Sequence, residues 1–191
     1  HSNYNNRIDK MGVILNYGQL PLIRSRYMKY INNEQHPYGE NVIVAIMSYG
    51  GFNVEDAILM NRASVERGMF RTTYFNMYES KESSLTVSTS DSDSKFMNIN
   101  DNKVLKQKPG YDYNYLNKNG LIKENTILND KIVVIGKAAV DPETNELVDQ
   151  STHCKKGQLG IVDKSFITDG EEGFRIAKVR IREERIPTLG D

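Results

Sequence analysis

The chain has 191 residues, a formal net charge of zero, and 38% hydrophobic and 26% charged residues. This composition is that of a folded domain with a core rather than a disordered segment, and the length fits one or two domains. Zero net charge leaves no overall basic field to attract nucleic acid. The single cysteine, Cys154, excludes an intrachain disulfide and a cysteine-rich zinc site.

The chain also lacks the signals of export and membrane insertion. No apolar run approaches the roughly 20 residues of a membrane-spanning helix, so we expect no membrane partner. The start at His1 carries neither an initiator Met nor the apolar region of a signal peptide. We therefore expect a piece of a longer, intracellular protein.

Two apolar runs and a glycine turn lie in the first part of the chain. Residues 41–48 contain a continuous run of apolar, largely β-branched side chains, which predicts a strand buried on both faces. Residues 49–53 (YGGFN) interrupt it as a turn. Residues 57–60 form a second short apolar run. Asn61 then stands where it can cap a short helix that Gly68 can end.

The rest of the chain has the pattern of short strands around a polar stretch. Residues 72–78 are rich in β-formers, whereas residues 80–108 have the composition of a mobile, solvated loop. Residues 131–135, 159–162 and 174–182 again have strand patterns. Many short strands with few helical periods predict a mostly-β (α+β), barrel-like architecture with short helices. Alternation along the last run places Phe174, Ile176, Lys178, Arg180 and Arg182 on one face, and Arg175, Ala177, Val179 and Ile181 on the other.

The residues with the clearest chemical potential are Glu55 and Asp56, directly after the glycine turn. Two adjacent carboxylates supply the hard oxygen ligands that magnesium prefers. In the alternative, Asn53 caps a helical turn and Asp56 lies at its third position, where a carboxylate complements the helix dipole. From these residues alone, the capping interpretation is the stronger one.

Other candidate residues also have two interpretations each. His153 and Cys154 resemble a metal or reactive-thiol site, but an ordinary loop is favoured because no second cysteine is present. Tyr111, Tyr113 and Tyr115 alternate, which fits a stacking stripe for bases or, more simply, a packed strand face. Scattered arginines are suited to phosphate contacts or to a solvated, salt-bridged surface: Arg7, Arg24, Arg26, Arg62, Arg67 and Arg71.

One long, ordered pattern goes beyond these short signals. Residues 39–71 read GENVIVAIMSYGGFNVEDAILMNRASVERGMFR. The order is an apolar strand, Tyr, a small residue, Gly, an aromatic, Asn, Glu-Asp, a second apolar run and Arg-Gly-hydrophobic-Phe-Arg. This segment resembles the second-largest subunit of multisubunit RNA polymerases, the β-type subunit. Further matching stretches lie at 6–11, 19–22, 120–122, 132–137, 160–163 and 179–191.

The resemblance implies a division of the chain by function. Residues 1–71 would belong to the hybrid-binding region and contribute to a double-psi β-barrel at the active centre. Residues 72–181 would be the inserted wall, called the flap in bacteria, with a variable loop at 80–108. Residues 182–191 would return to the barrel. The amino-acid sequence most resembles that of the corresponding subunits from large cytoplasmic DNA viruses. This resemblance would place the protein in a virus particle or the host cytoplasm.

The resemblance also implies chemistry and partners. Asp56, supported by Glu55, would lie beside the second magnesium ion, which arrives with the nucleoside triphosphate, while the largest subunit holds the first. Expected partners are the largest and other polymerase subunits, the DNA template, the RNA–DNA hybrid, nucleoside triphosphates, and initiation factors on the wall. We expect the isolated chain to be inactive. The alternative is a stand-alone wall-type module that docks initiation factors without catalysis.

Overall fold

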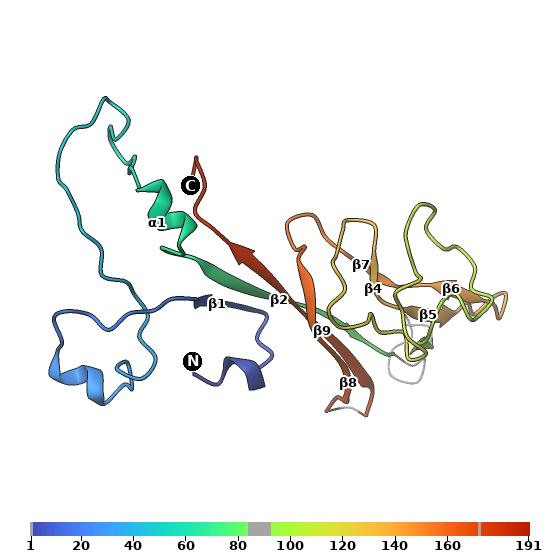
Figure 1. The fold of residues 1–191 in the computed structure, drawn as a ribbon. Helices are drawn as coiled ribbons and strands as arrows, with labels where there is room; N and C mark the ends of the chain where they lie inside the picture. Colours follow the sequence, from blue (N-terminus) through green and yellow to red (C-terminus); the bar gives the residue numbers. More distant parts are fainter. Residues whose placement is uncertain (1, 84–92, 172) are drawn as a thin grey trace. The chain divides into compact units, whose positions relative to one another are not determined.

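A computed structural model describes residues 2–83, 93–171 and 173–191 (Figure 1). Strands dominate it, as the sequence predicts, and among the described residues no helix is long and apolar enough to cross a membrane. The elements in chain order are η1 (Tyr4–Asn6), β1 (Met11–Leu15), η2 (Arg26–Lys29), α1 (Arg62–Glu66), β2 (Thr72–Lys81), β3 (Ser94–Phe96), β4 (Val133–Ile135), β5 (Lys137–Val140), β6 (Leu147–Asp149), β7 (Thr152–His153), β8 (Ile161–Asp169) and β9 (Arg175–Arg185).

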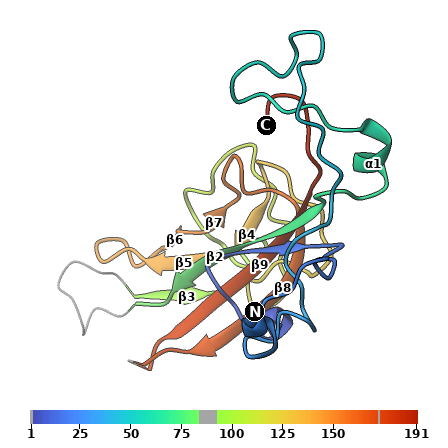
Figure 2. The same ribbon diagram turned by 90° about the vertical axis from the view of Figure 1, so that its left-hand side faces the viewer.

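The strands form three sheets. The largest has the order β1-β2-β9-β8, and smaller sheets have the orders β3-β5-β6 and β4-β7. Strands β8 and β9 form a long antiparallel hairpin (Figure 2), with a register running from Ile161 opposite Arg182 to Asp169 opposite Arg175. Strands are therefore found in each of the three late segments for which the sequence predicts them.

The contacts divide the chain into two units. Unit 1 comprises residues 1–3, 13–74 and 184–191, and unit 2 comprises residues 4–12 and 75–183. The functional boundaries expected at 71/72 and 181/182 stay predictions.

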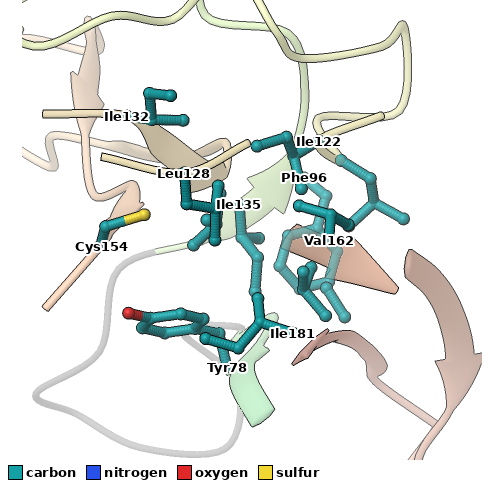
Figure 3. Packing of buried hydrophobic residues seen from close by; sticks show 13 residues of the cluster. Tyr78, Phe96, Ile122, Leu128, Ile132, Ile135, Cys154, Val162 and Ile181 are labelled. Carbon is teal, nitrogen blue, oxygen red and sulfur yellow. The ribbon is translucent and has the colours of Figure 1, made fainter. Parts of the chain in front are cut away.

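Unit 2 has its own hydrophobic core. The inward face of β9 supplies Ala177, Val179 and Ile181, each at most 1% exposed, which confirms the alternation predicted for this strand. Around them pack side chains that include Tyr78, Phe96, Ile122, Leu128, Ile135 and Val162 (Figure 3). A second cluster consists of Ile99, Val104, Tyr113, Leu116, Val133 and Ala138.

The outward face of β9 carries a buried cation. Alternation alone puts Arg180 on the charged face, yet its side chain is only 3% exposed. Its guanidinium forms an ion pair with Asp163 of β8 and donates to the backbone carbonyls of Tyr4 (2.9 Å) and Arg7 (2.8 Å). It also lies 4.7 Å from the ring centroid of Phe75. Segment 4–7 therefore contacts Arg180 on this face, which alternation along the strand does not predict.

The polar stretch 80–108 is more ordered than its composition predicts. Within it, β2 continues to Lys81, Ser94–Phe96 forms β3 against β5, and Ile99 and Val104 are buried. Residues 84–92 lie outside the described residues, so the predicted loop is not described there. The difference arises because a composition averaged over the whole stretch hides a few well-spaced apolar side chains.

Unit 1 differs from the sequence-based expectation in another way. Residues 41–48 form no strand, and Ile43 and Ile46 are fully exposed at 103% and 100%. Among the described residues of unit 1, Met28 is the only buried hydrophobic side chain. The prediction of a strand buried on both faces is therefore wrong for this chain. An apolar run predicts burial, but burial also needs a covering surface, and unit 1 does not supply one.

Candidate functional site

The glycine turn before the acidic pair is closed by a side chain. The amide nitrogen of Phe52 donates to the carbonyl of Tyr49 (3.1 Å), and Gly50 and Gly51 have φ angles of 57° and 77°. Such left-handed angles favour glycine because it has no Cβ. Asn53 Oδ1 accepts from the Tyr49 amide (3.0 Å), and Asn53 Nδ2 donates to the Met47 carbonyl (2.5 Å).

The acidic pair occupies a second turn directly afterwards. The amide of Ala57 donates to the carbonyl of Val54 (3.2 Å), which places Glu55 and Asp56 at the two central positions. Glu55 has a φ angle of 58°, a left-handed conformation that costs a non-glycine residue about 1 kcal/mol. Both carboxylates are exposed, and neither has a hydrogen-bond or ion-pair partner among the described residues.

This geometry overturns the capping interpretation of the pair. The Asn53 side chain reaches back to residues 47 and 49, not forward to the amide of Asp56. The helix begins only at Arg62, where Asn61 Oδ1 accepts from the Ser64 amide (2.9 Å), as predicted for that cap. Asn53 therefore does not cap a helical turn around Glu55 and Asp56.

Residues on either side of the exposed segment 41–60 are linked by a hydrogen bond. Glu40, just before it, accepts through Oε1 from the Phe70 amide (3.0 Å). After it, α1 and its C-terminal cap Arg67 are followed by Gly68, whose φ angle is 112° and where a Cβ would lie 2.6 Å from the ring of Tyr17. The residue before the segment is thus linked to residue 70, just beyond α1.

Most of the candidate arginines form ion pairs, which supports the salt-bridged interpretation for them. These pairs are Arg7–Asp9 (3.0 Å), Arg24–Glu34 (3.8 Å), Arg62–Glu66 (2.9 Å) and Arg71–Glu184 (3.4 Å). The Arg7 pair lowers the pKa of Asp9, chiefly through the hydrogen bond that Arg7 donates. Arginines engaged in this way show no feature that would assign them to phosphate contacts.

Of the three alternating tyrosines, Tyr111 and Tyr113 are packed, whereas Tyr115 is exposed. Tyr113 is buried, and its hydroxyl donates to Asp149 Oδ2 (2.6 Å) and accepts from the Lys108 amide (3.1 Å). Burial first, and the bond to Asp149 second, raise the pKa of Tyr113 to about 12. Tyr111 packs edge-on against His153 with ring centroids 4.4 Å apart. These two tyrosines favour the packed interpretation over base stacking.

His153 and Cys154 do not form a metal site. Among the described residues, no three His, Cys, Asp or Glu side chains gather as a metal-binding group. His153 Nε2 is buried without a hydrogen-bond partner, and burial lowers the pKa of the imidazole. Cys154 belongs to the core, and burial raises the pKa of its thiol to about 11.

The Cys154 thiol should therefore be protected in the folded chain. Because the thiolate is the reactive form, a pKa of about 11 leaves little reactive species at pH 8, and burial blocks access to the sulfur. We expect labelling by a disulfide reagent to be at least about 100-fold slower in buffer than in denaturant. Labelling at equal rates under both conditions would contradict the buried position.

Comparisons with known proteins identify the family. A family model described as "RNA polymerase Rpb2, domain 6" matches residues 1–191. The chain belongs to this family. A relative, the DNA-directed RNA polymerase II subunit RPB2 of Schizosaccharomyces pombe, is 36% identical over 200 residues. The DNA-directed RNA polymerase subunit Rpo2 of Saccharolobus solfataricus is 34% identical over 207 residues, and the Arabidopsis thaliana RNA polymerase II subunit 2 is 31% identical over 198 residues.

These relatives are much longer than the chain. Each match covers 100% of this chain but only 16% or 17% of the relative. The chain thus corresponds to one domain-sized part of a second-largest polymerase subunit. Family membership confirms the resemblance seen in residues 39–71, at the level of the subunit type.

The structure gives Asn53 a role that the sequence alone does not predict. The sequence places Asn53 in the turn at 49–53 and offers it as a helix cap, but it does not predict that the Asn53 side chain closes this turn. An Asn directly after a Gly-Gly-aromatic sequence is a usable signal for such closure, because asparagine side chains often bond to the backbone of a nearby turn.

Proposed function

We propose that the chain forms part of the active-centre region of a DNA-directed RNA polymerase and that Asp56, supported by Glu55, faces the second magnesium ion, which enters with the nucleoside triphosphate. The observation that carries this proposal is the pair of exposed carboxylates without partners on a closed turn. The family match and the relatives, which are DNA-directed RNA polymerase subunits, support RNA polymerization as the reaction.

The donor set fits magnesium as a shared ligand. Magnesium keeps several waters and commonly takes one or two carboxylates together with substrate phosphates. Glu55 and Asp56 supply two carboxylates, and no larger metal-binding group exists among the described residues. When bound, such an ion stabilises negative charge on the leaving phosphate oxygens. The role of this chain is to hold two carboxylates at a fixed place and leave their oxygens free.

The proposal also names partners. The exposed apolar run 41–48, which includes Ile43 and Ile46, calls for a covering surface, and we assign it to the remainder of the subunit and to the largest subunit. In the assembled enzyme, residues 1–71 and 182–191 would build the double-psi barrel along the RNA–DNA hybrid and DNA template. Residues 72–181 would form the wall that receives initiation factors. Viral origin, and a place in a virus particle or host cytoplasm, stay predictions that the flanking coding sequence can test.

A second function is favoured by the core of unit 2. That unit buries two hydrophobic clusters, whereas unit 1 buries only Met28 among its described hydrophobic residues. A wall that folds by itself is able to act as a docking module for initiation factors without catalysis. Capture of a purified initiation factor by this chain, without RNA synthesis after reconstitution with the other subunits, would favour this function.

The proposed role of Asp56 can be tested in the assembled polymerase. We expect Asp56→Ala to lower the rate of nucleotide addition about 10- to 100-fold at limiting magnesium, because one of the two carboxylates beside the metal is lost. The measurement is single-nucleotide extension of a preformed RNA–DNA scaffold over a magnesium series.

Glu66→Ala provides the matched control. Glu66 is also an exposed acid of unit 1, but it is paired with Arg62 on α1. We expect the magnesium dependence of the Glu66→Ala enzyme to equal that of the unmodified enzyme. An Asp56→Ala enzyme whose rate at limiting magnesium also equals the unmodified rate would refute the proposed role of the pair.

A further inference from the structure

We propose that Asn53 is a positioning residue that holds the acidic turn in its working geometry. This inference rests on the proposed function, because it concerns the placement of Glu55 and Asp56. It goes beyond that function by assigning a role to a residue that would touch neither metal nor nucleotide.

The burial pattern singles out Asn53. Every residue from 41 to 60 is exposed except Asn53, which is half-buried. Its side chain uses the amide in both directions: Oδ1 accepts from the Tyr49 amide, and Nδ2 donates to the Met47 carbonyl. These two bonds span four and six residues, farther than the backbone turn bond between Phe52 and Tyr49. The side chain is thus the main internal tie of this segment.

The two bonds of the Asn53 side chain directly precede the acidic turn in the sequence. Val54 directly follows Asn53, and its carbonyl accepts the bond from Ala57 that closes the turn around Glu55 and Asp56. The segment contains no helix or strand that would fix the turn in another way. The left-handed φ of Glu55 is unfavourable for a residue with a Cβ, so it needs support from its surroundings. Fixing residue 53 to residues 47 and 49 provides that support from the preceding side.

Asparagine suits this role because its amide group contains both an acceptor and a donor. Aspartate at position 53 would keep an acceptor for the Tyr49 amide but would face the Met47 carbonyl with a second oxygen. Alanine would keep neither bond. We therefore expect a graded loss of turn geometry from Asn to Asp to Ala, with the carboxylates of residues 55 and 56 chemically unchanged.

The test uses the assembled polymerase carrying Asn53→Ala or Asn53→Asp in the full-length subunit. The first measurement is amide hydrogen exchange of the peptide around residues 47–57, followed by mass spectrometry. We expect at least about tenfold faster exchange in Asn53→Ala and a smaller increase in Asn53→Asp. The second is the magnesium concentration at half-maximal nucleotide addition, expected to rise about tenfold in Asn53→Ala with little change in the maximal rate at high magnesium.

Asn41→Ala is the matched control. Asn41 is an exposed asparagine of unit 1 whose Oδ1 accepts from the Leu22 amide (3.1 Å) and whose Nδ2 donates to the Leu20 carbonyl (2.8 Å). It loses the same two kinds of bond away from the acidic turn. We expect Asn41→Ala to leave both the exchange of peptide 47–57 and the magnesium dependence unchanged.

Asp56→Ala, alone and combined with Asn53→Ala, separates the positioning role of Asn53 from the proposed magnesium role of Asp56. If Asn53 acts through Asp56, adding Asn53→Ala to Asp56→Ala should not shift the magnesium dependence further. The positioning role is overturned if Asp56→Ala raises the magnesium concentration at half-maximal nucleotide addition while Asn53→Ala does not. It is also overturned if Asn53→Ala leaves the amide hydrogen exchange of the turn unchanged. An Asp56→Ala enzyme with normal magnesium dependence would overturn both proposals. Should Asn53→Ala fail to assemble, Asn53→Asp decides by the same criteria.

Discussion

Replacement of Arg180 by Ala is expected to lower the free energy of unfolding by about 3 kcal/mol. Arg180 is 3% exposed and forms an ion pair with Asp163, and it donates to two backbone carbonyls of the N-terminal segment. Its removal leaves Asp163 without its main partner and leaves the carbonyls of Tyr4 and Arg7 without a donor. The loss lies at the low end for a buried pair because Arg182 still donates to Asp163 Oδ1 (3.0 Å).

The measurement is urea unfolding of the 191-residue chain followed by circular dichroism. Arg62→Ala is the control, because Arg62 forms an ion pair with Glu66 on an exposed helix, with a side chain 92% exposed. Exposed pairs of this spacing contribute only about 0.3–0.5 kcal/mol. Arg180→Lys keeps the charge but not the fork of donors, so we expect an intermediate loss. Equal losses for Arg180→Ala and Arg62→Ala would contradict the role of this contact.

Truncation of Ile135 to Ala should destabilise the chain by about 2–5 kcal/mol. Ile135 lies on β4, is 0% exposed and packs within the main cluster of unit 2 (Figure 3). Removing its side chain leaves a cavity that the close-packed neighbours fill only in part. The measurement is again the urea midpoint, with an unchanged slope expected if the variant keeps its fold.

Ile46→Ala removes the same atoms from an exposed position. Ile46 is 100% exposed, so we expect a change in unfolding free energy below about 0.5 kcal/mol in this chain. In the full-length subunit the same substitution should reduce assembly, because we propose that other parts of the polymerase cover residues 41–48. A large destabilisation of the isolated chain by Ile46→Ala would show that the run is covered within the chain itself.

Local signals predicted several elements correctly. Asn61 and Gly68 mark the start and end of α1 because capping and left-handed termination depend on a few neighbouring residues. The alternation in β9 predicted the buried face with Ala177 and Val179, since side chains on a strand point to opposite faces in turn. Features of this kind depend on neighbouring residues in the sequence, so they can be predicted without information on distant residues.

Features that depend on distant residues were not predictable in the same way. The burial of Arg180 comes from segment 4–7, far away in sequence, which covers the face that alternation leaves open. The apolar run at 41–48 predicts a need for burial but does not say whether a covering surface belongs to the same chain. The burial of Ile99 and Val104 within a polar stretch was not predicted. It depends on packing in a cluster with Tyr113, Leu116 and Val133.

The sequence by itself determined the type of protein, whereas the role that it predicts for Glu55 and Asp56 stays a prediction. A long ordered pattern around Glu55 and Asp56 carries family information, because each residue type in it is fixed by order and spacing. Only the tertiary structure decided against the helix cap. A side chain at Asn53 is able to bond forward or backward, and the chosen direction depends on where the folded backbone places Met47 and Tyr49. Asn53 therefore closes the turn before the acidic pair instead of capping a helical turn around it.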